Sequence, residues 1–235
     1  LAGGGTLALN AGDADDAARL CRDALPLCRE AGDHWGTALA LNILGMGARG
    51  TSDLERAEAL HREALHTAHA ADDAWGAALA LCGLADCAIG RKEYRQAEAQ
   101  AADALKLARA SRDRWLAAWA LGTRGLALMG CGDRAGADAL CRESLALFLE
   151  LGDLIGAYAC LEALAQISGT GLGLAKAARL LGAAHALRER VGSDPFPEEE
   201  KQIRRGTTLL RTLLGRARFQ TEWDRGRQTA IADLL

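Results

Sequence analysis

Three histidines close together in the sequence are the first residues whose type and spacing could support chemistry. His61, His66 and His69 lie on one predicted helix, and neutral imidazole is a common metal ligand. A metal pair on a helix needs side chains three or four residues apart on one face, and only His66 and His69 meet this condition. No cysteine or carboxylate completes the set. The sequence therefore predicts no metal site, and His61 is interpreted as a packing residue.

Two further motifs suggest chemistry that their spacing does not support. The glycine-rich run 169–176, GTGLGLAK, lacks the spacing and the preceding strand of a phosphate-binding loop, so it is interpreted as a turn. Cys82 and Cys87 are five residues apart on a helix and point in different directions, unlike a redox pair. No nucleophile beside a base and no paired carboxylates stand out. The sequence predicts no catalytic residues, no enzyme activity and no cofactor.

Composition favours an all-helical, cytoplasmic protein. Half of the 235 residues are apolar, and Val191 is the one valine in the chain, whereas strands are rich in β-branched residues. A net charge of −3 offers no basic surface for nucleic acid, so direct nucleic-acid binding is not expected. The sequence has no signal peptide and no membrane-spanning run. Seven cysteines without a framework spacing indicate free thiols in a reducing compartment.

The elements that must position any site are organised by a repeat of 40 residues. The chain divides into blocks 11–50, 51–90, 91–130 and 131–170, with a partial block at 171–194. Three columns recur at fixed places in the blocks: Ala17, Ala57, Ala97, Ala137 and Ala177; Asp33, Asp73, Asp113 and Asp153; and Trp35, Trp75 and Trp115. Such a period marks a solenoid, in which each unit buries its apolar face against its neighbours.

Each block is predicted to contain two antiparallel helices joined by short turns. The aspartates are expected to cap helix N-termini, and the glycines beside some of them, Gly12, Gly32, Gly132 and Gly152, to take the left-handed conformation that ends a helix. Small residues are expected to set the distance between helices, with leucines and the column tryptophans filling the core. Pro26 is expected to kink or shorten the helix over 14–31.

The repeat resembles the tetratricopeptide signature. Leu44-Gly45 is followed by Ala57 and Ala64 at the characteristic spacings, although the period is longer than that family's and the usual tyrosine is missing. Repeats of this form, followed by the tail residues Leu214, Gly215, Phe219, Trp223 and Gly226, are similar to the C-terminal part of large bacterial LuxR-type regulators and signal-transduction ATPases. Residues 1–194 are expected to form the helical repeats, with 1–10 as the remnant of an upstream repeat. Residues 195–235 are expected to form a helical cap, and Pro195-Phe196-Pro197 at its start breaks the repeat pattern.

The resemblance implies a right-handed α-solenoid whose concave groove is lined by the first helix of each tetratricopeptide pair, here the helix that carries the tryptophan column. Matching the family's groove positions by column gives Leu39, Asn42, Met46, Arg49, Leu79, Cys82, Asp86, Trp119, Leu126, Met129, Ala159, Glu162 and Gln166. Arg124 is added because it replaces the core leucine of the other blocks, and it is expected either to extend to solvent, to pair with an acid or to bind a ligand.

The function implied is the interaction or effector-sensing domain of a bacterial cytoplasmic regulator, which binds a protein, a peptide or a small molecule and alters upstream domains. The alternatives are a groove filled by neighbouring helices that binds nothing alone, and a constitutive scaffold that holds subunits together, with homo-oligomerisation as a further expectation. Single-stranded RNA binding is disfavoured by Asp86 and Glu162 in the predicted groove.

Overall fold

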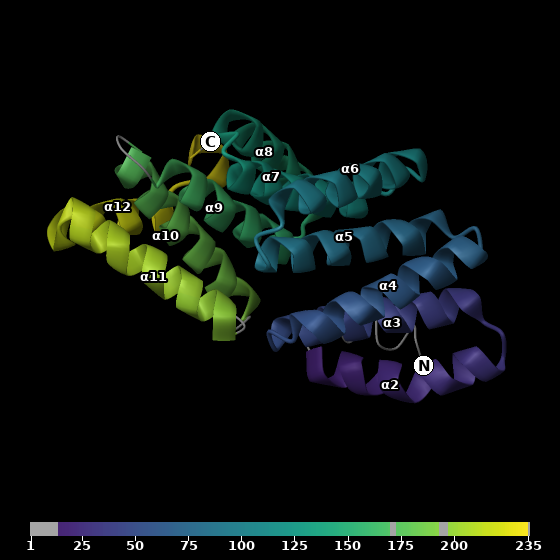
Figure 1. Ribbon diagram of the computed structural model, residues 1–235. Helices are drawn as coiled ribbons and strands as arrows, with labels where there is room; N and C mark the ends of the chain where they lie inside the picture. Colours follow the sequence, from purple (N-terminus) through teal and green to yellow (C-terminus); the bar gives the residue numbers. More distant parts are fainter. Residues whose placement is uncertain (1–13, 170–172, 193–196, 235) are drawn as a thin grey trace. The chain divides into compact units, whose positions relative to one another are not determined.

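A computed structural model of the chain describes residues 14–169, 173–192 and 197–234 (Figure 1). Within these ranges the secondary structure is helical, without strands, which confirms the predicted all-α class. The predicted remnant at 1–10, Gly12 and Pro195 lie outside the described residues. The helices are α2 (Ala14–Glu30), α3 (His34–Gly50), α4 (Leu54–Ala70), α5 (Ala74–Gly90), α6 (Tyr94–Ala110), α7 (Arg114–Cys131), α8 (Arg134–Leu151), α9 (Leu154–Ser168), α10 (Leu174–Val191), α11 (Pro197–Leu214), α12 (Arg216–Gln228) and the 3-10 helix η2 (Ile231–Leu234).

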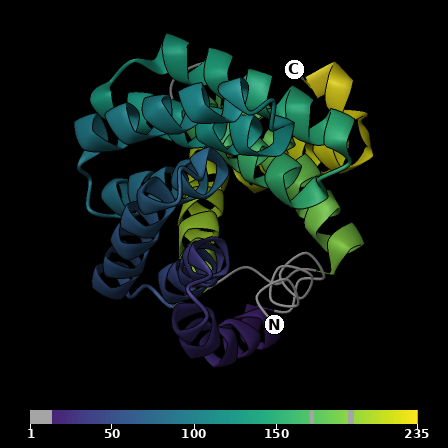
Figure 2. The ribbon, with the colours of Figure 1, turned by 90° about the vertical axis from the view of Figure 1, so that its right-hand side faces the viewer.

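Helices that are neighbours in sequence pack against each other, as expected for an α-solenoid. The chain forms two compact units, 1–123 and 124–235, whose boundary lies within α7. In the first unit α2 to α6 follow one another in chain order (Figure 2), and α3 also contacts α5 directly. In the second unit α8 packs on α9, and α9 on α10. We call α3, α5, α7 and α9 the tryptophan-column helices.

The recurring aspartates cap helices as predicted. Asp33, Asp53, Asp73, Asp133 and Asp153 each accept a hydrogen bond from the backbone N–H three residues later, at 2.8–3.2 Å. Each bond satisfies one of the N–H groups that have no partner within the helix, and the carboxylate also favours the positive end of the helix dipole. The repeat therefore fixes where each of these helices begins.

The turns before these caps use the left-handed conformation, with or without glycine. Gly32, Gly132 and Gly152 have φ values of 67°, 94° and 72°, as predicted. The same conformation is adopted by four residues that carry a side chain: Ser52, Asp72, Lys92 and Arg112, with φ between 51° and 65°. A β-carbon makes this conformation unfavourable by roughly 1 kcal/mol or more. The turns without glycine therefore hold strain that the packed helices on either side impose.

Replacing Arg112 with glycine is expected to stabilise the chain by about 1 kcal/mol, because glycine adopts the left-handed conformation without strain. The side chain of Arg112 is exposed, so its removal costs little packing. Urea unfolding at neutral pH measures the change. The matched control is Gly152→Ala at the equivalent turn, where a β-carbon would meet no atom within 4 Å and only the backbone penalty acts. Equal stability of Arg112→Gly and the parent chain would show that the turn is unstrained.

The small residues form the interior as predicted, whereas the column tryptophans do not. All five alanines of the alanine column are fully buried. Trp35 is 52% exposed and Trp115 is 37% exposed, so the expectation that the tryptophans fill the core is wrong. These residues lie in the first turn of their helices, and helical side chains point back toward the N-terminus, past the packed segment. Trp35 instead stacks on Trp75, with ring centroids 6.5 Å apart.

Pro26 does not shorten the helix as expected: α2 continues through Pro26 to Glu30. Proline removes one hydrogen bond from the helix ladder. Here it lies only one turn from the C-terminus of α2, so little helix remains beyond the lost bond.

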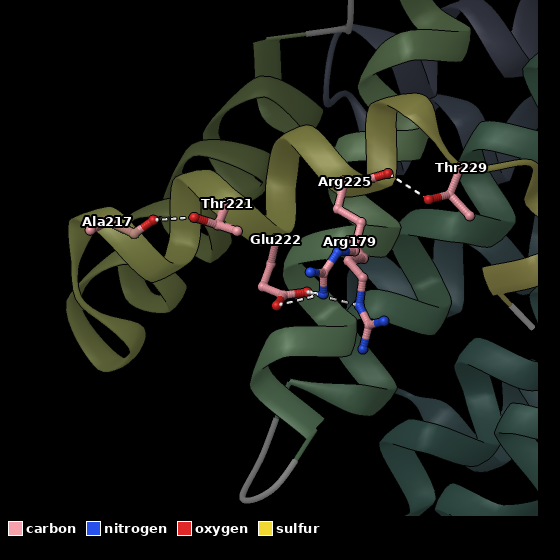
Figure 3. A network of polar contacts seen from close by, with 6 residues as sticks. All are labelled: Arg179, Ala217, Thr221, Glu222, Arg225 and Thr229. Atoms are coloured by element: carbon pink, nitrogen blue, oxygen red, sulfur yellow. Dashed lines mark hydrogen bonds and ion pairs between the residues drawn. The ribbon is translucent and has the colours of Figure 1, made fainter.

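The C-terminal helices cover α10. Both α11 and α12 contact α10, and Phe219 of α12 is buried. Trp223 packs against His185 of α10 with ring centroids 5.3 Å apart. Glu222 forms ion pairs with Arg179 of α10 at 3.1 Å and with Arg225 at 3.2 Å (Figure 3). The tail residues Phe219 and Trp223, on which the family resemblance was based, thus hold α12 against the last repeat helix.

Candidate functional site

Asp86 lies at the centre of a polar cluster that joins three tryptophan-column helices. Its Oδ1 accepts a hydrogen bond from Thr123 Oγ1 at 2.9 Å, and its Oδ2 accepts one from Trp119 Nε1 at 3.3 Å. Arg49 Nε lies 3.9 Å from Oδ2. Arg49 belongs to α3, Asp86 to α5, and Trp119 and Thr123 to the first part of α7. We call these four residues the Asp86 cluster, and all of them belong to the first unit.

The helical repeat explains how the donors converge. Trp119 and Thr123 are four residues apart, so they lie on the same face of α7. The side chain of Asp86 is only 14% exposed, and a charged group so far removed from water requires hydrogen-bond donors. The two donors from α7 therefore fix the orientation of the carboxylate while leaving part of it open to solvent.

The ion pair between Arg49 and Asp86 is loose compared with others in the chain. Its closest approach of 3.9 Å is too long for a hydrogen bond. By contrast, Arg188 Nε lies 2.9 Å from Glu162 and Arg179 Nε lies 3.1 Å from Glu222. The side chain of Arg49 is 33% exposed. Arg49 therefore neutralises the charge of Asp86 without occupying its oxygens.

An aromatic pair lies beside the carboxylate. The rings of Trp115 and Trp119 meet edge to face, with centroids 5.4 Å apart and an interplanar angle of 68°. This geometry is favourable for aromatic side chains and restricts the orientation of both rings. The cluster thus combines a carboxylate held by two donors, a guanidinium that makes no hydrogen bond to it and a partly exposed aromatic surface.

The thiols near Asp86, those of Cys82 and Cys87, are unreactive at neutral pH. Burial, reinforced by the charge of Asp86, raises the pKa of Cys82 well above its ordinary value and that of Cys87 to about 11. Because the thiolate is the reactive form, neither cysteine is a nucleophile at neutral pH.

Among the residues that the structure describes, no group of three metal-ligating side chains comes together. No described helix is both long and apolar enough to cross a bilayer.

The structure places the other residues of the predicted groove in different environments. Leu39, Asn42, Leu79 and Cys82 are buried, so they contribute packing rather than an accessible surface. Ala159 and Gln166 are exposed. The rest are partly buried: Met46, Arg49, Asp86, Trp119, Arg124, Leu126, Met129 and Glu162. Of the whole set, Arg49, Asp86 and Trp119 are brought together in one polar cluster. Thr123, which the sequence analysis missed, completes the cluster.

Asn42 belongs to a buried polar pair with His61 of α4. His61 Nδ1 lies 3.0 Å from Asn42 Oδ1, and Asn42 Nδ2 donates to the carbonyl of Gly76 at 3.3 Å. Because an amide oxygen only accepts, Nδ1 of His61 carries the proton and donates it. Burial, assisted by the charge of Arg49, lowers the pKa of His61 to about 4. His61 is thus a packing residue, as predicted, and it is neutral in the folded chain.

The chain is expected to lose stability as the pH falls from about 6.5 to about 4, because of His61. In the unfolded chain His61 takes up a proton near its ordinary pKa of 6.5, whereas the folded chain resists protonation down to about 4. The unfolded state therefore binds more protons in this window, and His61 costs the fold about 3 kcal/mol on full protonation. Urea unfolding across this range measures the loss. His61→Ala should show a shallower pH dependence, and identical slopes for the two chains would contradict the assignment.

The second unit contains a hydrogen-bonded ion pair at one of the predicted groove positions, Glu162. Arg188 of α10 donates to both carboxylate oxygens of Glu162, at 2.9 and 3.2 Å. Its guanidinium carbon lies 4.0 Å above the ring centroid of Tyr158. Both hydrogen bonds and the ring constrain Arg188, so Glu162 ties α9 to α10. Tyr158 and Arg188 carry no signal in the repeat columns, because their pairing depends on how α10 crosses α9.

Comparisons with known proteins show similarity of fold alone. No protein-family model matches the chain, and no curated protein matches it. A crystal structure of BtubC (BKLC) from P. vanneervenii superposes with a TM-score of 0.64 and 16% sequence identity. The match covers 92% of this chain and 88% of that chain. At this identity the chain shares an all-helical architecture with BtubC, and the likeness carries no statement of function.

Proposed function

We propose that the chain is a partner-binding or effector-sensing region of a bacterial cytoplasmic transcriptional or signalling regulator, with a tetratricopeptide-like fold and its ligand at the Asp86 cluster. The observation that carries the proposal is the carboxylate of Asp86. Two donors from α7 hold it in place, and Arg49 lies too far away to form a hydrogen bond with it. In this proposal the ligand contacts α3, α5 and α7 together and changes how firmly they pack.

The energetics of buried charge support a binding role. Removing charges from water is costly, and a buried ion pair repays that cost only with good geometry and additional hydrogen bonds. The pair of Arg49 and Asp86 lacks such geometry at 3.9 Å. An arginine that pairs so loosely with a largely buried carboxylate is best explained by recognition of a ligand.

The regulatory part of the proposal rests on the resemblance of the repeats and tail to bacterial regulators. A ligand that binds one conformation of the solenoid more tightly than another shifts the equilibrium of domains attached to it. In that setting DNA binding or ATP hydrolysis belongs to the parent protein and not to this region.

The test combines ligand screening with substitutions in the cluster. A set of bacterial metabolites and peptides is screened for compounds that raise the melting temperature of the chain. Asp86→Asn should remove the response to a true ligand and Trp119→Phe should weaken it, because the first removes the charge, whereas the second removes the N–H donor and part of the aromatic surface but leaves the charge in place. Arg62→Gln, at an exposed position of α4, is the matched control and should respond as the parent chain does. Ligand responses that survive Asp86→Asn would place binding elsewhere.

A constitutive scaffold is the second candidate, and the exposed aromatic rings favour it. Trp35 is half-exposed and stacks on Trp75, and exposed tryptophan is enriched in protein interfaces. A scaffold should self-associate or capture a subunit regardless of metabolites. Sedimentation of the parent chain and of Trp35→Ala distinguishes the two candidates, since only a scaffold held together through this pair should lose its assembly.

A further inference from the structure

The loose ion pair of the Asp86 cluster has the charge pattern of a receptor for a zwitterion. We propose, building on the proposed function, that the cluster binds the head group of a free α-amino acid with an apolar side chain. The ammonium group would contact Asp86 and the carboxylate would contact Arg49. Each end of the ligand thus finds the opposite charge on a different helix.

The acceptor end of this site is already oriented. An ionised carboxylate offers about four lone-pair positions, and Asp86 receives one short hydrogen bond, from Thr123 at 2.9 Å. Among the described parts of the chain, Oδ2 has only the longer contacts with Trp119 at 3.3 Å and Arg49 at 3.9 Å. An ammonium group would therefore find acceptor capacity on Oδ2 without displacing Thr123.

The donor end retains its binding capacity for the same reason. A guanidinium group presents five N–H donors in a planar fork that suits a carboxylate. The contact of Arg49 with Asp86 is too long to use these donors, and its side chain is partly exposed. A ligand carboxylate could accept two parallel hydrogen bonds from Arg49.

Both charges of the ligand are needed. A cationic side chain of a partner would be attracted by Asp86 but repelled by Arg49. A lone anion would be attracted by Arg49 but repelled by Asp86. A zwitterion instead completes a square in which opposite charges alternate at the corners, so that every neighbouring pair attracts. Residues inside a peptide lack this pattern because their backbone groups are neutral. The charge pattern therefore selects a free amino acid.

The surroundings of the pair indicate an apolar side chain. The rings of Trp115 and Trp119 lie on α7 beside the carboxylate. Met46 lies on α3 three residues before Arg49, so the two share a helix face, and it is only partly buried. An aliphatic or aromatic side chain placed here would be removed from water against these groups.

Calorimetric titration of the full chain tests the inference with L-leucine, L-methionine and L-phenylalanine as probes. At least one should bind saturably, and glycine should bind more weakly for lack of a side chain. N-acetyl-L-leucine lacks the ammonium charge and L-leucinamide lacks the carboxylate, so each should bind about tenfold more weakly than L-leucine or worse. Asp86→Asn and Arg49→Gln should each weaken binding by a similar factor, whereas Arg62→Gln should leave it unchanged.

Two results would overturn the inference. One is the absence of saturable binding for all three amino acids. The other is equal affinity for L-leucine and its two capped derivatives, or unchanged affinity in both cluster variants. If the amino acids fail while Asp86→Asn still abolishes the response to another compound, the proposed function stands and only the identification of the ligand is wrong.

Discussion

Replacing Gly226 with alanine is expected to detach α12 from α10 and to destabilise the second unit by about 3 kcal/mol. A β-carbon at Gly226 would overlap the carbonyl oxygen of Arg179 and lie 2.7 Å from its carbonyl carbon. A β-carbon at Gly182 would likewise overlap the backbone of Trp223. The two helices therefore touch backbone to backbone at both glycines. Because the obstacles are main-chain atoms of a helix, rotation of a side chain cannot relieve the clash.

The effect on α12 is measured by amide hydrogen exchange together with urea unfolding. Gly226→Ala should speed exchange throughout α12 while α3 to α5 keep their protection. Gly206→Ala in α11 is the matched control, because a β-carbon there would meet no atom within 4 Å. Alanine is also the better helix former, so this control should be neutral or gain about 0.5–1 kcal/mol. Unchanged exchange in α12 of Gly226→Ala would contradict the close approach of the two helices.

Replacing Gly83 with alanine is expected to cost the first unit about 3 kcal/mol through a clash with His61. A β-carbon at Gly83 would overlap the imidazole ring and lie 2.5 Å from Nδ1. The ring is buried, hydrogen-bonded to Asn42, and also lies against Gly45 on α3. It has no space into which it can move, so the helices must separate. Urea unfolding measures the loss.

A double substitution separates this clash from other effects. His61→Ala alone should be destabilising, since it leaves a cavity between α3, α4 and α5. In the chain with both His61→Ala and Gly83→Ala, the new methyl group occupies part of that space. The double variant should therefore be more stable than the sum of the single changes predicts, by about 2 kcal/mol. Strict additivity would mean that His61 and Gly83 do not share the same space.

The compensation between His61 and Gly83 is visible in two columns of the repeat. His61 shares its column with Cys21, Ala101 and Cys141, and Gly83 shares its column with Ile43, Thr123 and Ala163. His61 is the largest of the four residues in its column, and Gly83, in the same block, is the smallest of the four in its own. Size is thus balanced within a block, and the balance identifies which columns pack together. The alanine column and the aspartate caps were predictable because each depends on the local geometry of one repeat.

The features that escaped prediction depend on helix ends and on contacts between helices. The exposure of Trp35 follows from its place in the first turn, which a column of identical residues does not reveal. Asn42 was assigned to a binding surface by its column, but it turns to His61 because a buried imidazole N–H needs an acceptor. Arg188 pairs with Glu162 between the last two repeat helices, whereas the equivalent positions of an earlier block, Cys82 and Ala108, carry no charge. Only Thr123 had a usable signal, since it follows Trp119 by one helical turn.

The central claim is that Arg49 is kept for binding and contributes little to folding. The most direct measurement compares the free energy of unfolding of Arg49→Gln with that of Arg188→Gln at neutral pH. Removing Arg188 breaks two hydrogen bonds to the largely buried carboxylate of Glu162, at a cost of about 3 kcal/mol. With the residues that the structure describes, the side chain of Arg49 makes only the 3.9 Å contact with Asp86, so its removal should change stability by less than about 0.5 kcal/mol. A loss in Arg49→Gln as large as that in Arg188→Gln would show that the cluster is a structural tie between α3 and α5, and would contradict the account.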